Sequence, residues 1–149
     1  MAVQMKKIIE RMRRLFAHGV WAANDTLVGI HPEGAINCVA GGAIVRNSLV
    51  AFSSGKVVAC SASSRPLGFA QDSASEGEGL AVRLLGNAAG TAVGIAAEAV
   101  AQGDALYEAA NGKVGKTEGG YFIGYALTAA SADGEVEIQH CVPQEVSAS

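Results

Sequence analysis

The segment Leu67-Gly68-Phe69-Ala70 returns later in the chain as Ile123-Gly124-Tyr125-Ala126, and this recurrence decides the fold that the sequence predicts. Three further pairs of segments align when residues 41–86 are set over residues 97–142, the last after a slip of one position: Ala74-Ser75 with Ala130-Ser131, Leu80-x-Val82 with Val136-x-Ile138, and Gly55-Lys56-Val57 with Gly112-Lys113-Val114. Self-similarity at a fixed period is the signature of a repeated structural unit. The sequence therefore predicts the same unit twice, at 41–86 and at 97–142.

Each copy has the pattern of short β-strands joined by tight turns. Ser53-Ser54-Gly55 and Ala110-Asn111-Gly112 predict hairpin tips, because glycine and asparagine accept the positive φ that such turns need. In residues 135–139 polar and apolar residues alternate, which is typical of a strand with one buried face. Gly68 and Gly124 lack a side chain, so we expect another backbone to approach each of them closely. These patterns predict a mainly β fold with a compact, barrel-like body.

Outside the two copies, three further segments are predicted: a basic helical arm at 1–19, an extended connector at 20–40 and a frayed tail at 143–149. The arm is predicted because apolar residues recur at helical spacing over residues 3–18 and Gly19 is a stop signal. The connector should contain one or two short strands, for which the apolar pieces at 26–30 and 35–39 are the candidates. Between the copies we expect a turn at 87–90 and a strand at 93–97.

Charge is unevenly distributed along the chain, whose net charge is −3. Residues 1–16 contain five Lys/Arg and one Glu, which gives 5 − 1 = +4. The rest of the chain contains six Lys/Arg and 13 Asp/Glu, which gives 6 − 13 = −7. A basic arm on an acidic body predicts that the arm and the body have different partners.

The composition places the chain among folded proteins made in a reducing compartment. Half of its 149 residues are hydrophobic although only 5% are aromatic, which argues against a disordered chain. Cys38, Cys60 and Cys141 are odd in number and form no C-x-x-C pair, so we interpret them as small buried hydrophobic residues. No apolar run reaches the about 18–20 residues that would span a bilayer, and no signal-peptide pattern is found.

No catalytic or metal-binding constellation is predicted, and no cofactor is expected. The three histidines stand outside recognised catalytic motifs: His18, His31 and His140. His140 is adjacent to Cys141, and neighbouring residues of a strand point to opposite faces, which disfavours a joint site. Two pairs of glutamates at a spacing of two lie in or beside glycine-rich turns: Glu76 with Glu78, and Glu135 with Glu137. We expect these carboxylates to be solvated surface charges.

The order of motifs in the second copy resembles the capsid decoration, or cement, proteins of tailed bacteriophages. The resemblance extends over most of both copies and rests on these segments: Ala99-Val100-Ala101-Gln102-Gly103-Asp104-Ala105-Leu106-Tyr107, Asn111-Gly112-Lys113-Val114, Ile123-Gly124-Tyr125-Ala126-Leu127 and Asp133-Gly134-Glu135-Val136-Glu137-Ile138. The first copy is similar more loosely, with Arg46-Asn47-Ser48 where the family pattern has Gly-Asp, and Gln71 where it has Leu.

The resemblance implies a structural role without enzymatic activity. Such proteins bind the outer surface of the assembled capsid and stabilise contacts between major capsid subunits. The implied partners are the major capsid protein and further copies of the chain, a trimer being favoured over a dimer. The implied location is the outside of the virion, after synthesis in the host cytoplasm. No membrane is implied, and nucleic acid is not expected as a partner.

The arm and Trp21 lie beyond the segments that carry the resemblance, and they are the predicted interface with the capsid or a sister subunit. The candidate interface residues are Met5, Lys6, Lys7, Ile8, Arg11, Met12, Arg14, Phe16 and Trp21. Three alternatives are open for the arm: a solvated terminus, an element that binds nucleic acid or an anionic membrane, or an element that docks on an acidic protein surface. Trp21 is either a core residue of the connector or an interface anchor.

Two other functions stay open on the sequence alone. A carbohydrate- or ligand-binding β module would need a concave pocket with convergent polar and aromatic groups, against which the scarcity of aromatics counts. A nucleic-acid-associated protein would contact phosphates through residues 6–14, and its binding would be sensitive to salt. The acidic body argues against a broad footprint on nucleic acid.

Overall fold

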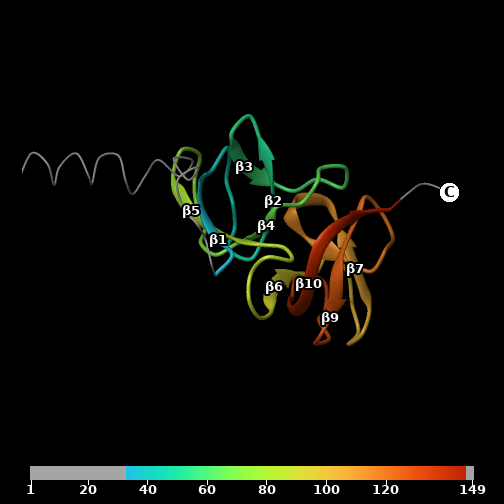
Figure 1. Cartoon of the computed structure of the whole chain (residues 1–149). Coiled ribbons are helices and arrows are strands. Elements are labelled where there is room, and N and C mark those ends of the chain that lie inside the picture. Colours follow the sequence, from blue (N-terminus) through green and yellow to red (C-terminus); the bar gives the residue numbers. More distant parts are fainter. Residues whose placement is uncertain (1–32, 147–149) are drawn as a thin grey trace, which may run out of the picture.

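The computed structural model describes residues 33–146, which form two five-stranded antiparallel sheets. The first sheet has the order β1-β5-β4-β2-β3 and contains β1 (Ala35–Val39), β2 (Leu49–Ser53), β3 (Lys56–Ala59), β4 (Gly68–Ala70) and β5 (Gly79–Leu84). The second has the order β6-β10-β9-β7-β8 and contains β6 (Ala92–Ile95), β7 (Ala105–Glu108), β8 (Val114–Gly115), β9 (Tyr121–Ala126) and β10 (Glu135–Glu145). Figure 1 shows the sheets side by side as two lobes, which we call the first and the second unit. The predicted mainly β fold is confirmed.

The two units have the same topology, because each strand of the second sheet follows its counterpart by five places in the order. Each sheet curls until its edge strands meet at one parallel bridge, Ala40 with Val57 in the first unit and Ala96 with Val114 in the second. Such curling leaves little open edge for unwanted strand pairing. The prediction of a barrel-like body built from two repeated β units is therefore confirmed.

The repeated unit begins earlier in the structure than the residues 41 and 97 predicted from the sequence. Strand β1 lies within the predicted connector and pairs along its whole length with β5. Strand β6 likewise begins at Ala92 and pairs with β10. These first strands read Ala-Ile-Asn-Cys-Val and Ala-Val-Gly-Ile, so they share too little identity for a sequence alignment to include them.

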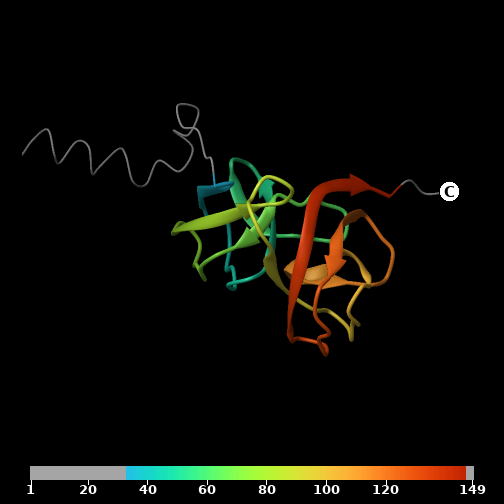
Figure 2. The same ribbon diagram turned by 60° about the horizontal axis from the view of Figure 1, so that its bottom comes forward.

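Strand β10 is longer than predicted, and this corrects the expectation of a frayed tail from residue 143. It continues to Glu145, and Gln144 pairs with Phe122 of β9. Figure 2 shows β10 running along the whole second unit. Pro143 is accommodated at a register shift between His140 and Gln144, where a ladder hydrogen bond is not required. The predicted helical arm, residues 20–32 of the connector and residues 147–149 lie outside the described residues.

Glycine at the start of β4 and within β9 allows the neighbouring strand to approach closely, as predicted. A Cβ atom on Gly68 would overlap the backbone carbonyl oxygen of Arg83 in β5. A Cβ atom on Gly124 would overlap the carbonyl oxygen of Gln139 in β10, which is the position equivalent to Arg83 in the second unit. The two glycines are therefore needed for the same steric reason in the two units.

Both predicted hairpin tips are present and have positive φ at two successive residues. The values are 51° and 78° at Ser54 and Gly55, and 61° and 73° at Asn111 and Gly112. The second tip also joins the two units, because the Gly112 N–H donates a hydrogen bond of 2.9 Å to the carbonyl oxygen of Cys60.

Four tight turns of one kind lead into β2, β5, β7 and β10. In each, the N–H of the fourth residue donates to the carbonyl of the first, at 2.9–3.1 Å, over residues 45–48, 75–78, 101–104 and 131–134. The third residue has positive φ in every case: Asn47, Gly77, Gly103 and Asp133. Glycine, asparagine and aspartate are the residues that tolerate this conformation best. Each unit thus contains two related halves, a shorter period than the one predicted from the sequence.

The two units share one of the two apolar cores. The first core belongs to the first unit alone, whereas the second combines the interior of the second unit with Leu49, Ala51, Cys60, Phe69 and Leu85 of the first. The Phe69 ring is fully buried and lies so close to Gly94 that a Cβ there would be 2.9 Å from the ring atom Cε1. Cys38 is the counterpart of Gly94, because these residues pair with Leu80 and Val136 at equivalent positions. Gly94 thus makes room for an aromatic ring from the other unit.

A buried carboxylate lies at the same junction. Glu108 is 4% exposed, and its Oε2 accepts a hydrogen bond of 3.0 Å from the Cys60 thiol. Burial raises the pKa of Glu108, and the hydrogen bond from Cys60 opposes that rise only in part. Burial and the neighbouring Glu108 raise the pKa of Cys60, and burial raises the pKa of Cys38 to about 11. Cys38 and Cys60 are fully buried free thiols, as predicted, whereas Cys141 is half-buried.

We expect the variant Glu108→Gln to make the protein more stable at neutral pH. The raised pKa means that the folded state holds the Glu108 proton more tightly than the unfolded chain does. The contribution of this group to stability is therefore complete below the ordinary glutamate pKa of about 4.3, and it is lost as the pH rises towards the folded-state pKa. The free energy of unfolding, measured in urea from pH 4 to pH 8, should accordingly fall less with rising pH in the variant.

Glu118→Gln is the matched control, since Glu118 is exposed in a neighbouring loop. The free energy of unfolding of this control should change with pH as that of the unmodified protein does. If Glu108→Gln also gives a parallel curve, the burial of Glu108 does not couple its proton to folding.

Candidate functional site

The predicted interface residues lie outside the part of the chain that the structure describes: Met5, Lys6, Lys7, Ile8, Arg11, Met12, Arg14, Phe16 and Trp21. Their role as an interface stays a prediction. The described residues nevertheless present surfaces that the sequence patterns did not predict.

Charge in the described body differs between the two units. Residues 34–71 contain three basic residues and no Asp or Glu: Arg46, Lys56 and Arg65. Residues 117–146 contain five acidic residues and no Lys or Arg: Glu118, Asp133, Glu135, Glu137 and Glu145. The first range contains the β2–β3 hairpin and the second contains β9 and β10, which Figure 1 places in different lobes. Over the whole units, residues 33–85 contain four basic and four acidic residues, 4 − 4 = 0, whereas residues 86–146 contain two basic and eight acidic residues, 2 − 8 = −6. The second lobe is therefore acidic and the first is neutral, with its basic residues concentrated in residues 34–71.

Three aromatic rings stack on the outer face of the second sheet. Tyr107 and Phe122 pack edge to face with ring centroids 5.8 Å apart, and Phe122 packs on Tyr125 at 5.3 Å. Strand pairing places them on one face, since Tyr107 pairs with Phe122 and the buried Ile123 and Ala126 point to the core. Tyr125 is 49% exposed, so this aromatic cluster is open to solvent.

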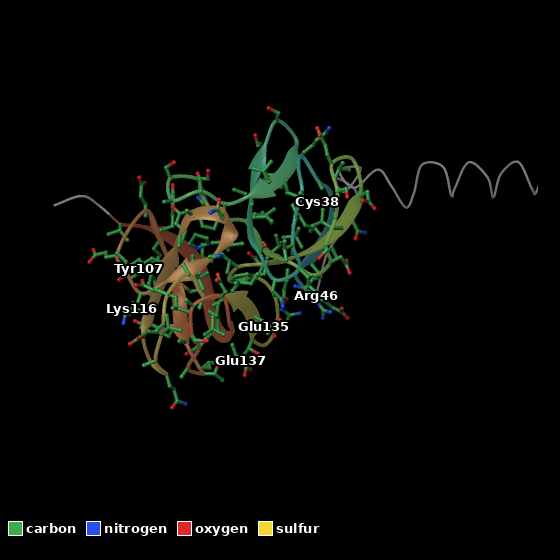
Figure 3. All side chains as sticks on the ribbon, turned by 180° about the vertical axis from the view of Figure 1, so that it is seen from behind. Cys38, Arg46, Tyr107, Lys116, Glu135 and Glu137 are labelled. Atoms are coloured by element: carbon green, nitrogen blue, oxygen red, sulfur yellow. The ribbon has the colours of Figure 1, made fainter. Side chains whose placement is uncertain are left out.

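Two carboxylates extend the same face along β10. Glu135 and Glu137 alternate with the fully buried Val136 and Ile138, as the sequence predicted. Asn47 Nδ2 donates to Glu135 Oε1 at 3.0 Å, and Thr91 Oγ1 donates to Glu137 Oε1 at 2.8 Å. These neutral donors orient the carboxylates, and the nearest labelled basic group in Figure 3 is Arg46 of the first unit. We call this surface, made of Tyr107, Phe122, Tyr125, Glu135 and Glu137, the acidic aromatic face.

A second apolar surface lies on the first unit, in a basic environment. Phe52 is 55% exposed and lines a shallow groove of about 500 Å³ with Ser64, Arg65, Pro66 and Leu67. Lys56 pairs with the neighbouring Ser53 in the β2–β3 hairpin. This groove suits an apolar or acidic partner, in contrast to the acidic aromatic face.

A polar groove of about 320 Å³ lies where the two units meet. Its lining residues come from both units: Arg46, Asn47, Gln71, Arg83, Thr91, Ala92 and Val93. Figure 3 shows Arg46 of the first unit close to Glu135 and Glu137 of the second, while Tyr107 and Lys116 lie farther away. A ligand-binding module would need polar and aromatic groups in one concave site. Polar groups converge here, but no aromatic residue lines the groove.

Glu98 fixes the loop that follows β8. Its Oε1 accepts hydrogen bonds from the N–H groups of Lys116 and Thr117, at 3.0 and 2.9 Å, and from the Thr117 hydroxyl at 2.7 Å. These hydrogen bonds lower the pKa of Glu98, those from Thr117 having the largest effect. The role of Glu98 in this arrangement is structural.

The described histidine, His140, links the two units. His140 Nδ1 accepts a hydrogen bond of 2.8 Å from the Gly86 N–H, which links β10 to the loop after β5. Burial lowers the pKa of His140, which favours the neutral ring that this bond requires. Within residues 33–146 no group of three or more His, Cys, Asp or Glu residues could hold a metal ion. No helix in this part of the chain is long and apolar enough to cross a membrane.

Comparison with known proteins identifies the family. The head fiber gp8.5 N base of bacteriophage phi29 has a similar fold, with a TM-score of 0.60 at 19% identity over 76% of this chain and 98% of that one. No curated protein sequence matches the chain. The family model described as phage cement protein matches residues 19–141, which include both units. The chain therefore belongs to the phage cement protein family.

Proposed function

We propose that this protein is a non-enzymatic decoration protein that binds the outer surface of the assembled phage head and stabilises contacts between major capsid subunits. The observation that carries the proposal is the family match over residues 19–141, because it covers both units rather than a single motif. The fold shared with a head fiber base is consistent with it.

The surfaces of the described residues support a binding role. Large apolar side chains are exposed on both units, with Phe52 at 55% and Tyr125 at 49%. Phe52 lines a groove with the basic Arg65, whereas Tyr125 belongs to the second unit, whose net charge is −6. Apolar patches flanked by charge are typical of protein contacts, since burial provides affinity and charge selects the partner.

The mechanism follows from mass action. A protein that binds the assembled shell and not its separated subunits stabilises the shell by RT ln(1 + [L]/Kd) for each occupied site. At a free concentration 100 times Kd this amounts to about 2.7 kcal/mol per site. If further copies of the chain associate at a symmetry axis, several attachments are made at once and the effect multiplies.

The proposal predicts that added protein saturates heads that lack it and protects them from heat. Heads purified from a phage without this gene would be mixed with the protein and imaged by electron cryomicroscopy. Density for the two-unit body should appear on the outer surface, and DNA release on heating should shift to higher temperature. Heads that stay undecorated at micromolar protein would contradict the proposal.

A variant without residues 1–19 tests whether the arm contributes to binding. We propose that the arm adds contact to the shell or to a sister subunit, so occupancy at equal concentration should fall. Unchanged occupancy would reject a contribution of the arm and leave binding by the body intact.

A further inference from the structure

The acidic aromatic face is the counterpart of a face that is covered in the first unit. Phe69 pairs with Leu49, and Tyr125 pairs with Ala105 at the same place in the second sheet. Phe69 and Leu49 are fully buried because the second unit packs on them, whereas Tyr125 is 49% exposed. Within the described residues, the face around Phe69 is therefore covered, whereas the equivalent face around Tyr125 is not.

A second copy of the body cannot cover this face by repeating the contact between the units. That contact needs Gly94, which leaves space for the Phe69 ring. The first unit has Cys38 at the equivalent position, and Cys38 is 1% exposed in that unit's own core. The pocket that Tyr125 would need in another copy is therefore already filled.

The chemistry of the face defines what fits it. Stacked rings favour an apolar or cationic group, since a cation over an aromatic ring is attracted by its π-electrons. The second unit, residues 86–146, carries eight acidic and two basic residues, and its net charge of 2 − 8 = −6 is the same when the ion pair of Lys113 with Asp133 is allowed for, so a basic partner is favoured. Residues 1–16 of this chain combine a net charge of +4 with Met5, Ile8, Met12 and Phe16. The basic surface around Phe52, by contrast, would repel this segment.

We propose that in the free protein the basic arm, residues 1–19, docks on the acidic aromatic face of its own chain. Residues 20–32, which join the arm to the body, can span about 43–47 Å when extended. A body of this size has a radius of gyration of only about 13 Å, so the arm can reach the far unit. Attachment within one chain corresponds to an effective concentration in the millimolar range, which favours the chain's own arm over that of another copy.

Photo-crosslinking from the arm of the full-length protein tests this inference. Ile8 would be replaced by p-benzoylphenylalanine, and the crosslinked peptides would be identified by mass spectrometry in low salt. We expect crosslinks to β9 and β10, near Phe122 and Tyr125. Their yield should fall several-fold at about 1 M salt, where the Debye length is about 3 Å. Mixing unlabelled with ¹⁵N-labelled protein identifies the source of the arm, because crosslinks within one chain join peptides of the same label.

The double variant Glu135→Gln/Glu137→Gln removes two charges and keeps an oxygen to accept the hydrogen bonds from Asn47 and Thr91. It should lower the crosslink yield several-fold. The matched control Glu33→Gln/Glu76→Gln makes the same change of charge on the first unit and should leave the yield unchanged. Circular dichroism would verify that both variants fold.

Three results would overturn the inference: crosslinks mainly to the first unit, a yield that neither salt nor the double variant changes, or peptides of mixed label, which would show docking between copies. None of these outcomes depends on heads, so failure here is distinct from failure of the proposed capsid role.

Discussion

Replacement of Phe69 by alanine should destabilise the protein by about 3–5 kcal/mol, the range measured for large-to-small changes at fully buried aromatic residues. The ring has no exposed surface and enters the core of the second unit, against Gly94. Its removal would leave a cavity between the units that neither sheet can close by a local shift, because both backbones are fixed by strand pairing. Since a domain of this size is stabilised by only about 5–15 kcal/mol, the midpoint of urea unfolding should fall markedly.

Tyr125→Ala is the matched control, because Tyr125 occupies the equivalent position in the second sheet and is 49% exposed. Its cost should be much smaller, limited to the ring contact with Phe122 and an aromatic side chain that is already half solvated. Equal losses for the two variants would mean that the junction between the units contributes little to stability.

Replacement of Gly68 by alanine should be similarly costly, for a steric reason. The new methyl group would overlap the backbone carbonyl oxygen of Arg83, and a backbone atom cannot rotate away as a side-chain end can. Strands β4 and β5 would have to separate, with loss of ladder hydrogen bonds beside the buried Phe69. We expect a loss of about 3 kcal/mol or more in the free energy of unfolding, at the upper end of the range for overpacking. Urea unfolding measures it directly.

Gly42→Ala is the control for Gly68→Ala, because a Cβ atom on Gly42 would meet nothing within 4 Å. Its backbone φ also lies outside the left-handed region, so alanine is accommodated without strain and should leave stability nearly unchanged. A mild effect of Gly68→Ala would show that the β4–β5 pair can separate, contrary to the close packing in the structure.

Of the candidate site, the sequence predicted the alternation that exposes Glu135 and Glu137 and the absence of a catalytic pattern around them. It did not predict the aromatic cluster, because Tyr107, Phe122 and Tyr125 come from strands whose pairing includes a bulge at Ile123. A strict alternation along β9 would place Phe122 and Tyr125 on opposite faces. The acidic excess of residues 86–146 over residues 33–85 is present in the sequence, but the prediction separated only the basic arm from the rest of the chain.

The four related turns leave a signal in the sequence that alignment by identity does not detect. Asn47, Gly77, Gly103 and Asp133 each stand three positions before a buried Val or Leu at the start of a strand. The spacing is constant, but the residue types differ, and identity does not treat asparagine, aspartate and glycine as equivalent. In this turn the three residue types are equivalent, because all of them tolerate positive φ.

Local sequence was sufficient to establish the mainly β class, the duplication, the hairpin tips and the close approach at Gly68 and Gly124. These features depend on turn chemistry and on the alternation of residues along one strand, which are properties of short segments. Tertiary packing was needed to establish that the face around Phe69 is buried between the units while the equivalent face around Tyr125 stays open. Two copies of one pattern cannot reveal which copy covers the other, because that depends on Gly94 and Cys38, single residues whose effect appears only when distant strands pack together.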